Sequence, residues 1–331
     1  MDHVTATEQP IWWWRYQLAS SGALNRASDR RLHEGVLIRV GRGHGCIHPW
    51  PELGDAALED ELVALKQGQP LRLGQAALTC ATIDAAAREQ GAWLFDHFDM
   101  PASHALWTQA EHEPPDQVDK RVDALLDDGF EALKIKAGTP LPELLALLER
   151  IHAAGHGRLR LRLDFNATLE AEDLRQLAGR MSPGLRQSIE FVEDPLPYHP
   201  DQWSQLGTDT GLRLALDRDL ERGSSGYQVA IVKPSTLNAA GWLAAKHLPM
   251  ILTSSMQHPL GQLYDAWMTR VFARSPDHQL AGCGLLTHEC YAPDPFLERM
   301  SRRGPVLVPP AGGTGLGFDD LLDSLPWNRL T

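Results

Sequence analysis

Apolar residues recur along the chain in two different rhythms, and the change between them falls near Asp99. Before Asp99, alternating apolar and polar residues predict an antiparallel pair of strands within residues 11–40. Leucine and alanine at helical spacing then predict helices over residues 56–66 and 76–89. After Asp99, short apolar runs alternate with amphipathic stretches, which is typical of strands buried on both faces and covered by helices.

The second part of the chain alternates helices with strands. Amphipathic helices are predicted over residues 116–128, 141–154 and 170–181. The apolar strands contain, in chain order, the segments EALKIKAG, LRLRLDFN, IEFVEDP, LRLALDRD, VAIVKPS, MILTSS and HQLAGCG. Because a series of this kind closes most readily into a TIM-type (β/α) barrel, the pattern predicts an α/β fold.

The length of 331 residues is large for one ordinary core, so we expect two units. The first is an α+β domain over residues 1–98, and the second is the barrel over residues 99–301. The tail, residues 302–331, is too rich in glycine and proline for a barrel helix, and we expect it to return to the first domain.

Each of several predicted strands ends in an ionisable residue. These residues are Lys136, Asp164, Glu193, Asp217 and Lys233. In a barrel such positions point into one cavity at the C-terminal face. Three carboxylates cannot all stay ionised in a cavity of low dielectric without a cation. Oxygen-only ligation suits Mg²⁺, with Mn²⁺ as an alternative, so the sequence predicts a divalent metal site.

Two lysines stand two residues apart in the first of these strands. Lys134 and Lys136 therefore point to the same face. Crowding and partial desolvation are expected to lower the pKa of at least one of them, which would make it a usable base. Asp219 lies two residues after Asp217 on the same face, so it is an alternative third metal ligand.

Composition narrows the choice of partner. The net charge of −12 argues against nucleic acid and against an anionic membrane surface. The N-terminus lacks a basic region followed by an apolar one, and no apolar run reaches about 18 residues, so we expect a cytoplasmic protein. The cysteines lack the CxxC spacing of a zinc site, and His44 and His48, in a turn-rich segment, are expected at the surface. A small molecule remains as the expected partner, and both a monomer and a homo-oligomer stay open.

The short motifs at the strand ends resemble a known family. They are KIK (134–136), LRLDFN (161–166), FVEDP (191–195), LALDRDL (214–220), IVKP (231–234) and TSSMQHPLG (253–261), and DRRLHEGVLIRV (29–40) is similar to the start of the family's capping domain. Their order and spacing resemble the enolase superfamily, in particular its muconate-lactonising subgroup, and most closely the o-succinylbenzoate synthases. The resemblance implies an enolase-like barrel with an N-terminal capping domain.

The resemblance also implies a role for each matching residue. Asp164, Glu193 and Asp217 would bind Mg²⁺, Lys136 would be the general base, and Lys233 would stabilise an enolate from the opposite face. Lys134 would orient the substrate carboxylate and depress the pKa of Lys136. Further positions that match contacts to substrate or to metal-bound water are Arg162, Asn166, Ser254, Ser255 and Gly282.

The implied reaction is the dehydration of 2-succinyl-6-hydroxy-2,4-cyclohexadiene-1-carboxylate to 2-succinylbenzoate in menaquinone biosynthesis. Two positions depart from the family pattern: Arg218 and Asp219 follow Asp217 where Glu-Ser is usual, and Gln257 and His258 stand where an acidic and a small residue are common. An N-acylamino acid racemase or a dipeptide epimerase of the same superfamily stays open as an alternative. A barrel that binds a small acid without turnover is a third reading.

Overall fold

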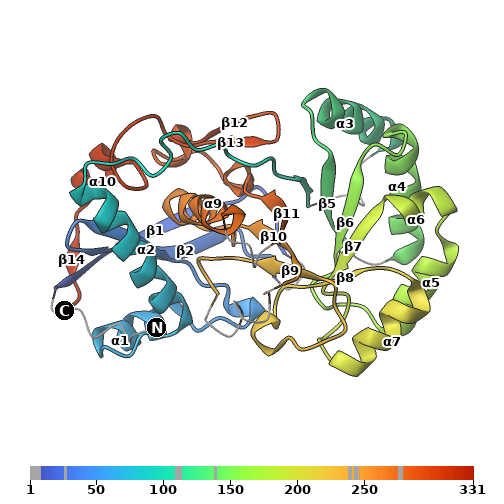
Figure 1. Ribbon diagram of the computed structural model, residues 1–331, viewed down its shortest axis with the longest axis horizontal. Helices are drawn as coiled ribbons and strands as arrows, with labels where there is room; N and C mark the ends of the chain where they lie inside the picture. Colours follow the sequence, from blue (N-terminus) through green and yellow to red (C-terminus); the bar gives the residue numbers. More distant parts are fainter. Residues whose placement is uncertain are drawn as a thin grey trace.

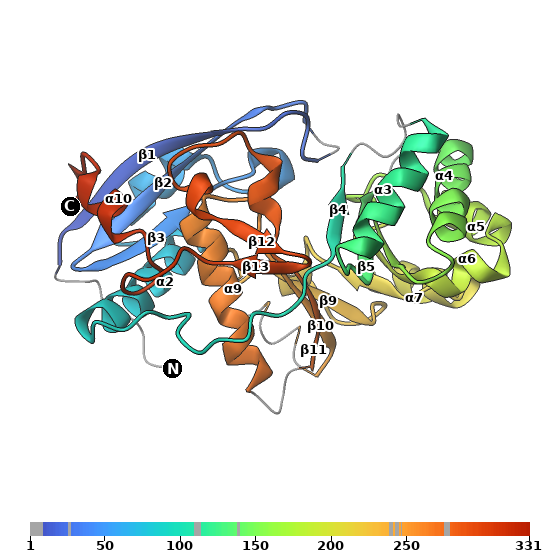
Figure 2. The ribbon, with the colours of Figure 1, turned by 90° about the horizontal axis from the view of Figure 1, so that it is seen from above.

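The computed structural model describes residues 9–25, 28–108, 114–137, 140–237, 241, 245, 247–274 and 279–331. Figures 1 and 2 show a sheet with helices at one end of the molecule and a ring of strands and helices at the other. No helix among the described residues is long and apolar enough to cross a membrane.

The first domain is a four-stranded antiparallel sheet covered by two helices. In spatial order its strands are β14 (Asn328–Arg329), β1 (Ile11–Ala19), β2 (Leu32–Val40) and β3 (Gly43–Ile47). Its helices are α1 (Leu58–Lys66) and α2 (Arg72–Glu89), and the short 3₁₀ helix η1 (Pro51–Leu53) precedes them. The predicted antiparallel pair is β1 and β2, which pair along their whole length.

Strand β3 lies where a turn-rich segment was expected. A Cβ atom at Gly45 would lie 2.1 Å from the carbonyl oxygen of Ala77, and one at Gly43 would lie 1.9 Å from that of Ala81. The glycines therefore let helix α2 pack directly on the strand backbone. In the sequence alone, glycines at such positions look like those of a turn, which is why a turn-rich segment was expected here. His44 and His48 are buried as a consequence, and the expectation that they lie at the surface is wrong.

The second domain is a barrel of eight parallel strands. In chain order these are β4 (Ala105–Trp107), β5 (Ala132–Lys136), β6 (Arg160–Asp164), β7 (Ile189–Glu193), β8 (Leu214–Leu216), β9 (Val229–Val232), β10 (Pro249–Thr253) and β11 (Gln279–Gly284). Each strand pairs with the next in sequence, and the ring closes where the His104 amide donates to the carbonyl oxygen of Cys283 at 2.8 Å. The predicted fold class is confirmed, although strand β4 was not predicted.

Helices cover the outside of the barrel. They are α3 (Pro115–Asp127), α4 (Leu141–Ala154), α5 (Ala171–Arg180), α6 (Pro183–Ser188), α7 (Pro200–Thr210) and α9 (Pro259–Ala273). Between β8 and β9 the helical segment is only the 3₁₀ helix η3 (Leu220–Arg222). Arg218, Leu220 and Glu221 of this short connection line the cavity described below.

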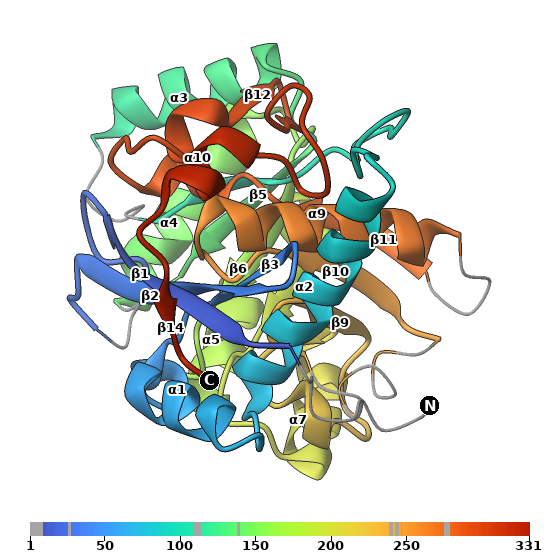
Figure 3. The same ribbon diagram turned by 90° about the vertical axis from the view of Figure 1, so that its left-hand side faces the viewer.

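The C-terminal segment runs back along the first domain (Figure 3). Its elements are η4 (Thr287–Cys290), η5 (Leu297–Arg299), β12 (Ser301–Arg303), β13 (Val306–Val308), α10 (Asp319–Ser324) and β14. The buried Asp84 of helix α2 accepts a hydrogen bond from the Leu316 amide at 2.7 Å, and Arg88 donates to the Gly317 carbonyl at 2.9 Å. The exact domain boundaries stay a prediction.

Candidate active site

The ends of strands β5, β6 and β7 bring two lysines and two carboxylates together. Lys136 pairs in register with Asp164, and Asp164 pairs in register with Glu193, so their side chains leave the sheet at one level. The Lys134 ammonium lies 2.7 and 2.6 Å from the two carboxylate oxygens of Glu193 and 2.8 Å from Asp164 Oδ2. Lys136 donates to the same Asp164 oxygen at 2.6 Å. All four side chains are buried.

This ion-pair network determines the charge states of the group. Burial by itself lowers the pKa of Lys134, but Asp164 and Glu193 outweigh it and raise that pKa well above its ordinary value. At Lys134 the two carboxylates therefore outweigh desolvation, and the expectation that one lysine of the pair has a lowered pKa stays a prediction. Burial and the neighbouring Asp164 raise the pKa of Glu193 to about 8. Burial opposes ionisation of Asp164 as well, yet Lys134 and Lys136 hold its pKa well below the usual range.

A second ion pair stands at the ends of β8 and β9. Lys233 directly follows β9 and donates to Asp217, which directly follows β8. Asp217 lines the cavity and its side chain is 11% exposed, whereas the side chain of Asp219 is 39% exposed and lies 3.6 Å from Arg222. Asp217 is therefore the better placed of the two carboxylates that sequence left open as a third ligand.

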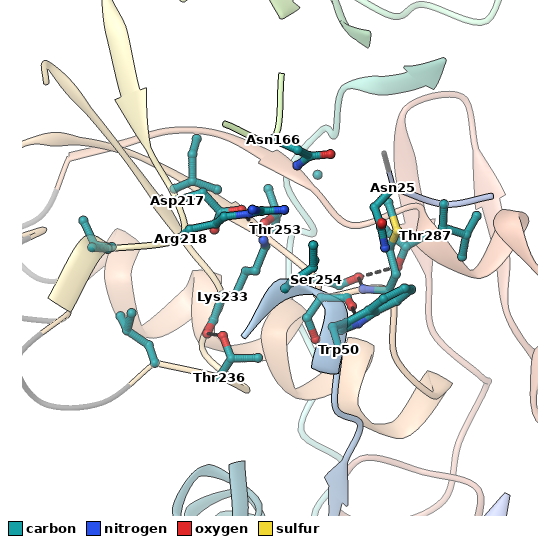
Figure 4. Close-up of a pocket in the computed structure, with 18 of the residues that line it drawn as sticks. Asn25, Trp50, Asn166, Asp217, Arg218, Lys233, Thr236, Thr253, Ser254 and Thr287 are labelled. Carbon is teal, nitrogen blue, oxygen red and sulfur yellow. Dashed lines mark hydrogen bonds and ion pairs between the residues drawn. The ribbon is translucent and has the colours of Figure 1, made fainter. Parts of the chain in front are cut away.

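Both domains line the cavity above these groups (Figure 4). The first domain contributes Leu24, Asn25, Trp50, Leu53, Asp55 and Arg72. Trp50 Nε1 donates to the Ser255 carbonyl at 2.8 Å, and Arg72 Nη1 donates to the Thr236 carbonyl at 2.9 Å. These hydrogen bonds tie the first domain to the loops after β10 and β9, so the domain forms part of the wall of the site.

The structure separates the predicted substrate contacts into two groups. Those that line the cavity are Lys134, Asn166, Ser254 and Ser255. Arg162 lies inside the barrel instead, where it donates to Glu190 at 2.8 Å and to His104 Nδ1 at 2.8 Å. A Cβ atom at Gly282 would lie 2.8 Å from Arg162 Nη2, so this glycine makes room for the guanidinium. His104 itself lines the cavity and was not predicted, since it precedes the strand that sequence missed.

The unusual pair Gln257 and His258 does not line the cavity. The amide of Gln257 donates to the buried Asp265 at 2.8 Å, and Asp265 also accepts from the Ser235 amide at 2.7 Å. His258 precedes helix α9 and accepts a hydrogen bond from the Leu260 amide at 3.2 Å. Through Asp265, Gln257 is linked to the loop after β9, and His258 caps helix α9. Neither residue lines the cavity in which a ligand would bind.

The donor set fits a hard divalent cation. Three carboxylates converge from consecutive strands, and the buried Oδ1 atom of Asn166 has no hydrogen-bond partner among the described residues. The described residues do not include a ready-made group of three His, Cys, Asp or Glu ligands. The three carboxylates are instead paired with lysines. Lys134 forms ion pairs with both Asp164 and Glu193, and Lys233 forms one with Asp217.

Two family models match the chain. Residues 11–87 match the N-terminal domain of O-succinylbenzoate synthase, and residues 117–228 match the enolase C-terminal domain-like family. The chain belongs to the enolase superfamily. It is o-succinylbenzoate synthase-like, and it shares the fold of that superfamily.

Individual relatives agree with this assignment. The chain is 29% identical to the o-succinylbenzoate synthase of Bdellovibrio bacteriovorus, over 95% of this chain and 97% of the relative. It is 24% identical to that of Klebsiella pneumoniae, over 77% and 86%. A solved dipeptide epimerase from Cytophaga hutchinsonii, in complex with Mg and the dipeptide D-Ala-L-Val, superposes with a TM-score of 0.73 at 15% identity, covering 98% of this chain and 99% of the epimerase. At that identity the structural match shows the fold alone.

Proposed function

We propose that the protein is an o-succinylbenzoate synthase, a carbon–oxygen lyase that dehydrates 2-succinyl-6-hydroxy-2,4-cyclohexadiene-1-carboxylate to 2-succinylbenzoate. The observation that carries the proposal is the placement of Lys136 and Lys233 at the ends of strands β5 and β9, with three carboxylates from the intervening strands β6, β7 and β8. The match of residues 11–87 to an o-succinylbenzoate synthase domain, which lines the cavity, supports this substrate.

Asp164, Glu193 and Asp217 would hold Mg²⁺ or Mn²⁺. Asn166 Nδ2 donates to Asp164 Oδ1 at 3.0 Å, and the buried Oδ1 atom of Asn166 has no hydrogen-bond partner among the described residues. When bound, the metal supplies positive charge that stabilises negative charge developing on the substrate carboxylate. Lys134 and Lys233, which neutralise these carboxylates in the structure, would then be available to the anionic substrate. The small-molecule carboxylate is thus the expected ligand of the site.

One lysine would carry out both proton transfers, and a second would stabilise charge. Lys136 would take the proton from the carbon next to the carboxylate and return it to the leaving hydroxyl group. The C–H and C–O bonds break on the same face, a ring double bond forms, and water leaves as the ring becomes aromatic. Lys233 would face the developing negative charge from the other side of the cavity.

The test is direct conversion of the cyclohexadiene substrate by the purified protein with Mg²⁺, followed by ultraviolet absorbance of the aromatic product. The proposal expects conversion that chelation stops and that fresh Mg²⁺ restores. Full conversion in excess chelator would contradict the metal site, and no conversion under any condition would contradict the reaction.

A second function is favoured by one observation. A lysine at each side of the cavity could also deprotonate both configurations of an α-carbon, and the dipeptide epimerase of Cytophaga hutchinsonii shares the fold. Epimerisation of dipeptides or racemisation of N-acylamino acids is therefore the alternative reaction for this site. Exchange of the α-proton of such compounds with solvent deuterium is its signature.

A further inference from the structure

Arg218 lines the cavity, and two of its side-chain hydrogen-bond donors have no acceptor among the described residues. Its side chain extends from the chain next to Asp217 into the cavity (Figure 4). Its Nε and Nη2 atoms are buried, and neither has a hydrogen-bond partner among the described residues. Buried polar groups are nearly always paired, so a guanidinium with two buried unpaired donors calls for an explanation.

The other cations that line the cavity all have carboxylate partners. Arg72 pairs with Asp55, and the partnered lysines are Lys134, Lys136 and Lys233. Arg218 is the one cation for which no ion pair is found among the described residues that line the cavity. The unused positive charge of the cavity is therefore concentrated at this residue.

The backbone holds Arg218 in place. Its amide donates to Asp194 Oδ2 at 3.1 Å, and the Asp217 amide donates to Asp194 Oδ1 at 3.1 Å. Asp194 is 3% exposed and adopts a left-handed backbone conformation with φ of 39°. This carboxylate fixes the turn at the end of β8, so the root of the Arg218 side chain is set by a buried residue rather than by a loose loop.

We propose that Arg218 determines substrate specificity by binding a second carboxylate of the substrate, remote from the reacting carbon. A guanidinium presents a planar fork that matches a carboxylate with two hydrogen bonds, and such pairs gain strength in a dry site. The carboxylate next to the reacting carbon belongs near Lys134 and the three acidic residues, which leaves Arg218 for another anionic group. The inference rests on the proposed function, whose substrate carries a ring carboxylate and a succinyl carboxylate.

The experiment compares two ligands and four proteins by titration calorimetry with Mg²⁺ present. The ligands are 2-succinylbenzoate and 2-butyrylbenzoate, which differ by the replacement of the succinyl carboxylate with a methyl group. The proteins are the wild type, Arg218→Gln, Arg218→Lys and the control Arg222→Gln. Arg222 lies four residues away in η3, its side chain is 78% exposed, and it does not line the cavity. Its replacement therefore makes the same change in net charge and breaks only an exposed ion pair with Asp219.

The wild type should bind 2-succinylbenzoate about ten- to a hundredfold more tightly than 2-butyrylbenzoate, as expected for a charge-assisted contact. Arg218→Gln should weaken only 2-succinylbenzoate and bring the ratio of the two dissociation constants below about threefold, while Arg222→Gln should keep the wild-type ratio. A wild-type ratio in Arg218→Gln, equal weakening of both ligands, or no preference in the wild type would each overturn the inference.

Arg218→Lys keeps the charge and the aliphatic stem but loses the fork, and it serves if the glutamine variant does not fold. The ratio of its dissociation constants for 2-butyrylbenzoate and 2-succinylbenzoate should be about threefold or more below that of the wild type. A ratio equal to that of the wild type would contradict bidentate pairing. Turnover separates this inference from the proposed function. Conversion by the wild type without an Arg218-dependent ratio overturns the inference alone, whereas an Arg218-dependent ratio without conversion supports the inference and contradicts the dehydratase.

Discussion

The Lys134 ammonium bridges both carboxylate oxygens of Glu193, at 2.7 and 2.6 Å, although strand β6 lies between the strands that carry the two residues. Both side chains are buried, at 7% and 1% exposure. Without a metal ion, the protein therefore neutralises its predicted metal ligands with its own lysine. A divalent cation and Lys134 compete for the same oxygens, and this competition can be measured apart from catalysis.

The first prediction concerns that competition. Lys134→Gln leaves Glu193 without its buried counter-charge and leaves Asp164 with Lys136 as its remaining lysine partner, so in excess chelator the free energy of unfolding should fall by about 3 kcal/mol or more. Adding Mg²⁺ should stabilise the variant more than it stabilises the wild type, because no ammonium has to be displaced. Urea unfolding with chelator and with Mg²⁺ measures both effects. Equal Mg²⁺ stabilisation of the two proteins would contradict the competition.

The second prediction separates the two candidate third ligands. Asp217→Asn should remove most of the affinity for Mg²⁺, measured by titration calorimetry, because this carboxylate lines the cavity at the end of β8. Asp219→Asn is the matched control, since its side chain is partly exposed and faces Arg222. The reverse order of effects would show that Asp219 is the ligand.

Part of this arrangement could be predicted from sequence. The strand-end positions of Lys136, Asp164 and Glu193 follow from short apolar runs with a fixed side-chain alternation, and the structure places these residues together. The pairing of Lys134 with Glu193 could not be predicted, because it depends on the lateral order and tilt of three strands. The same pairing raises the pKa of Lys134, and the sequence pattern does not show it.

The residues that the first domain contributes to the cavity could not be predicted from the sequence pattern either. Trp50 and Arg72 reach the cavity only because of the way the first domain packs on the barrel, and periodicity carries no information about that packing. The interior position of Arg162 shows a similar limit. Its place on β6 was predicted, but the pairing with Glu190 and His104 requires the closed ring.

The third prediction uses buried histidines between the two domains. Burial, with a contribution from Arg30, lowers the pKa of His33 to about 4, and burial lowers that of His258 to about 3. An unfolded chain takes up protons at these positions below about pH 6.5 while the folded protein does not. Stability is therefore present above pH 6.5 and is lost as the pH falls toward 4, by about 1.4 kcal/mol per pH unit for each histidine once it is protonated in the unfolded chain.

Denaturant unfolding at pH 7.5, 6 and 5 checks this slope. His258→Asn keeps an acceptor before helix α9 and removes one titrating group, so its slope between pH 6 and 5 should be smaller than that of the wild type. His97→Asn is the control because the His97 side chain is 93% exposed, and its slope should equal that of the wild type. A wild-type slope in His258→Asn would contradict the prediction.

The fourth prediction distinguishes the roles of the catalytic lysines. Lys136→Ala should eliminate dehydration, since the same group carries out both proton transfers. Lys233→Ala should lose about a hundredfold or more in rate, because charge left uncompensated in a dry site costs about 3 kcal/mol. In deuterated solvent, Lys136→Ala should exchange the α-proton of neither enantiomer of an N-succinylamino acid. Exchange of one enantiomer through Lys233 would indicate a racemase-type site.

The most direct test of the proposed reaction compares two substrate classes on the wild-type protein with Mg²⁺ in deuterated solvent, by proton nuclear magnetic resonance. The ratio of interest is kcat/KM for conversion of the cyclohexadiene substrate to 2-succinylbenzoate against kcat/KM for α-proton exchange of dipeptides and N-succinylamino acids. A dehydratase predicts conversion of the cyclohexadiene with the higher kcat/KM. Proton exchange of a dipeptide or N-succinylamino acid, with no aromatic product from the cyclohexadiene, would contradict it.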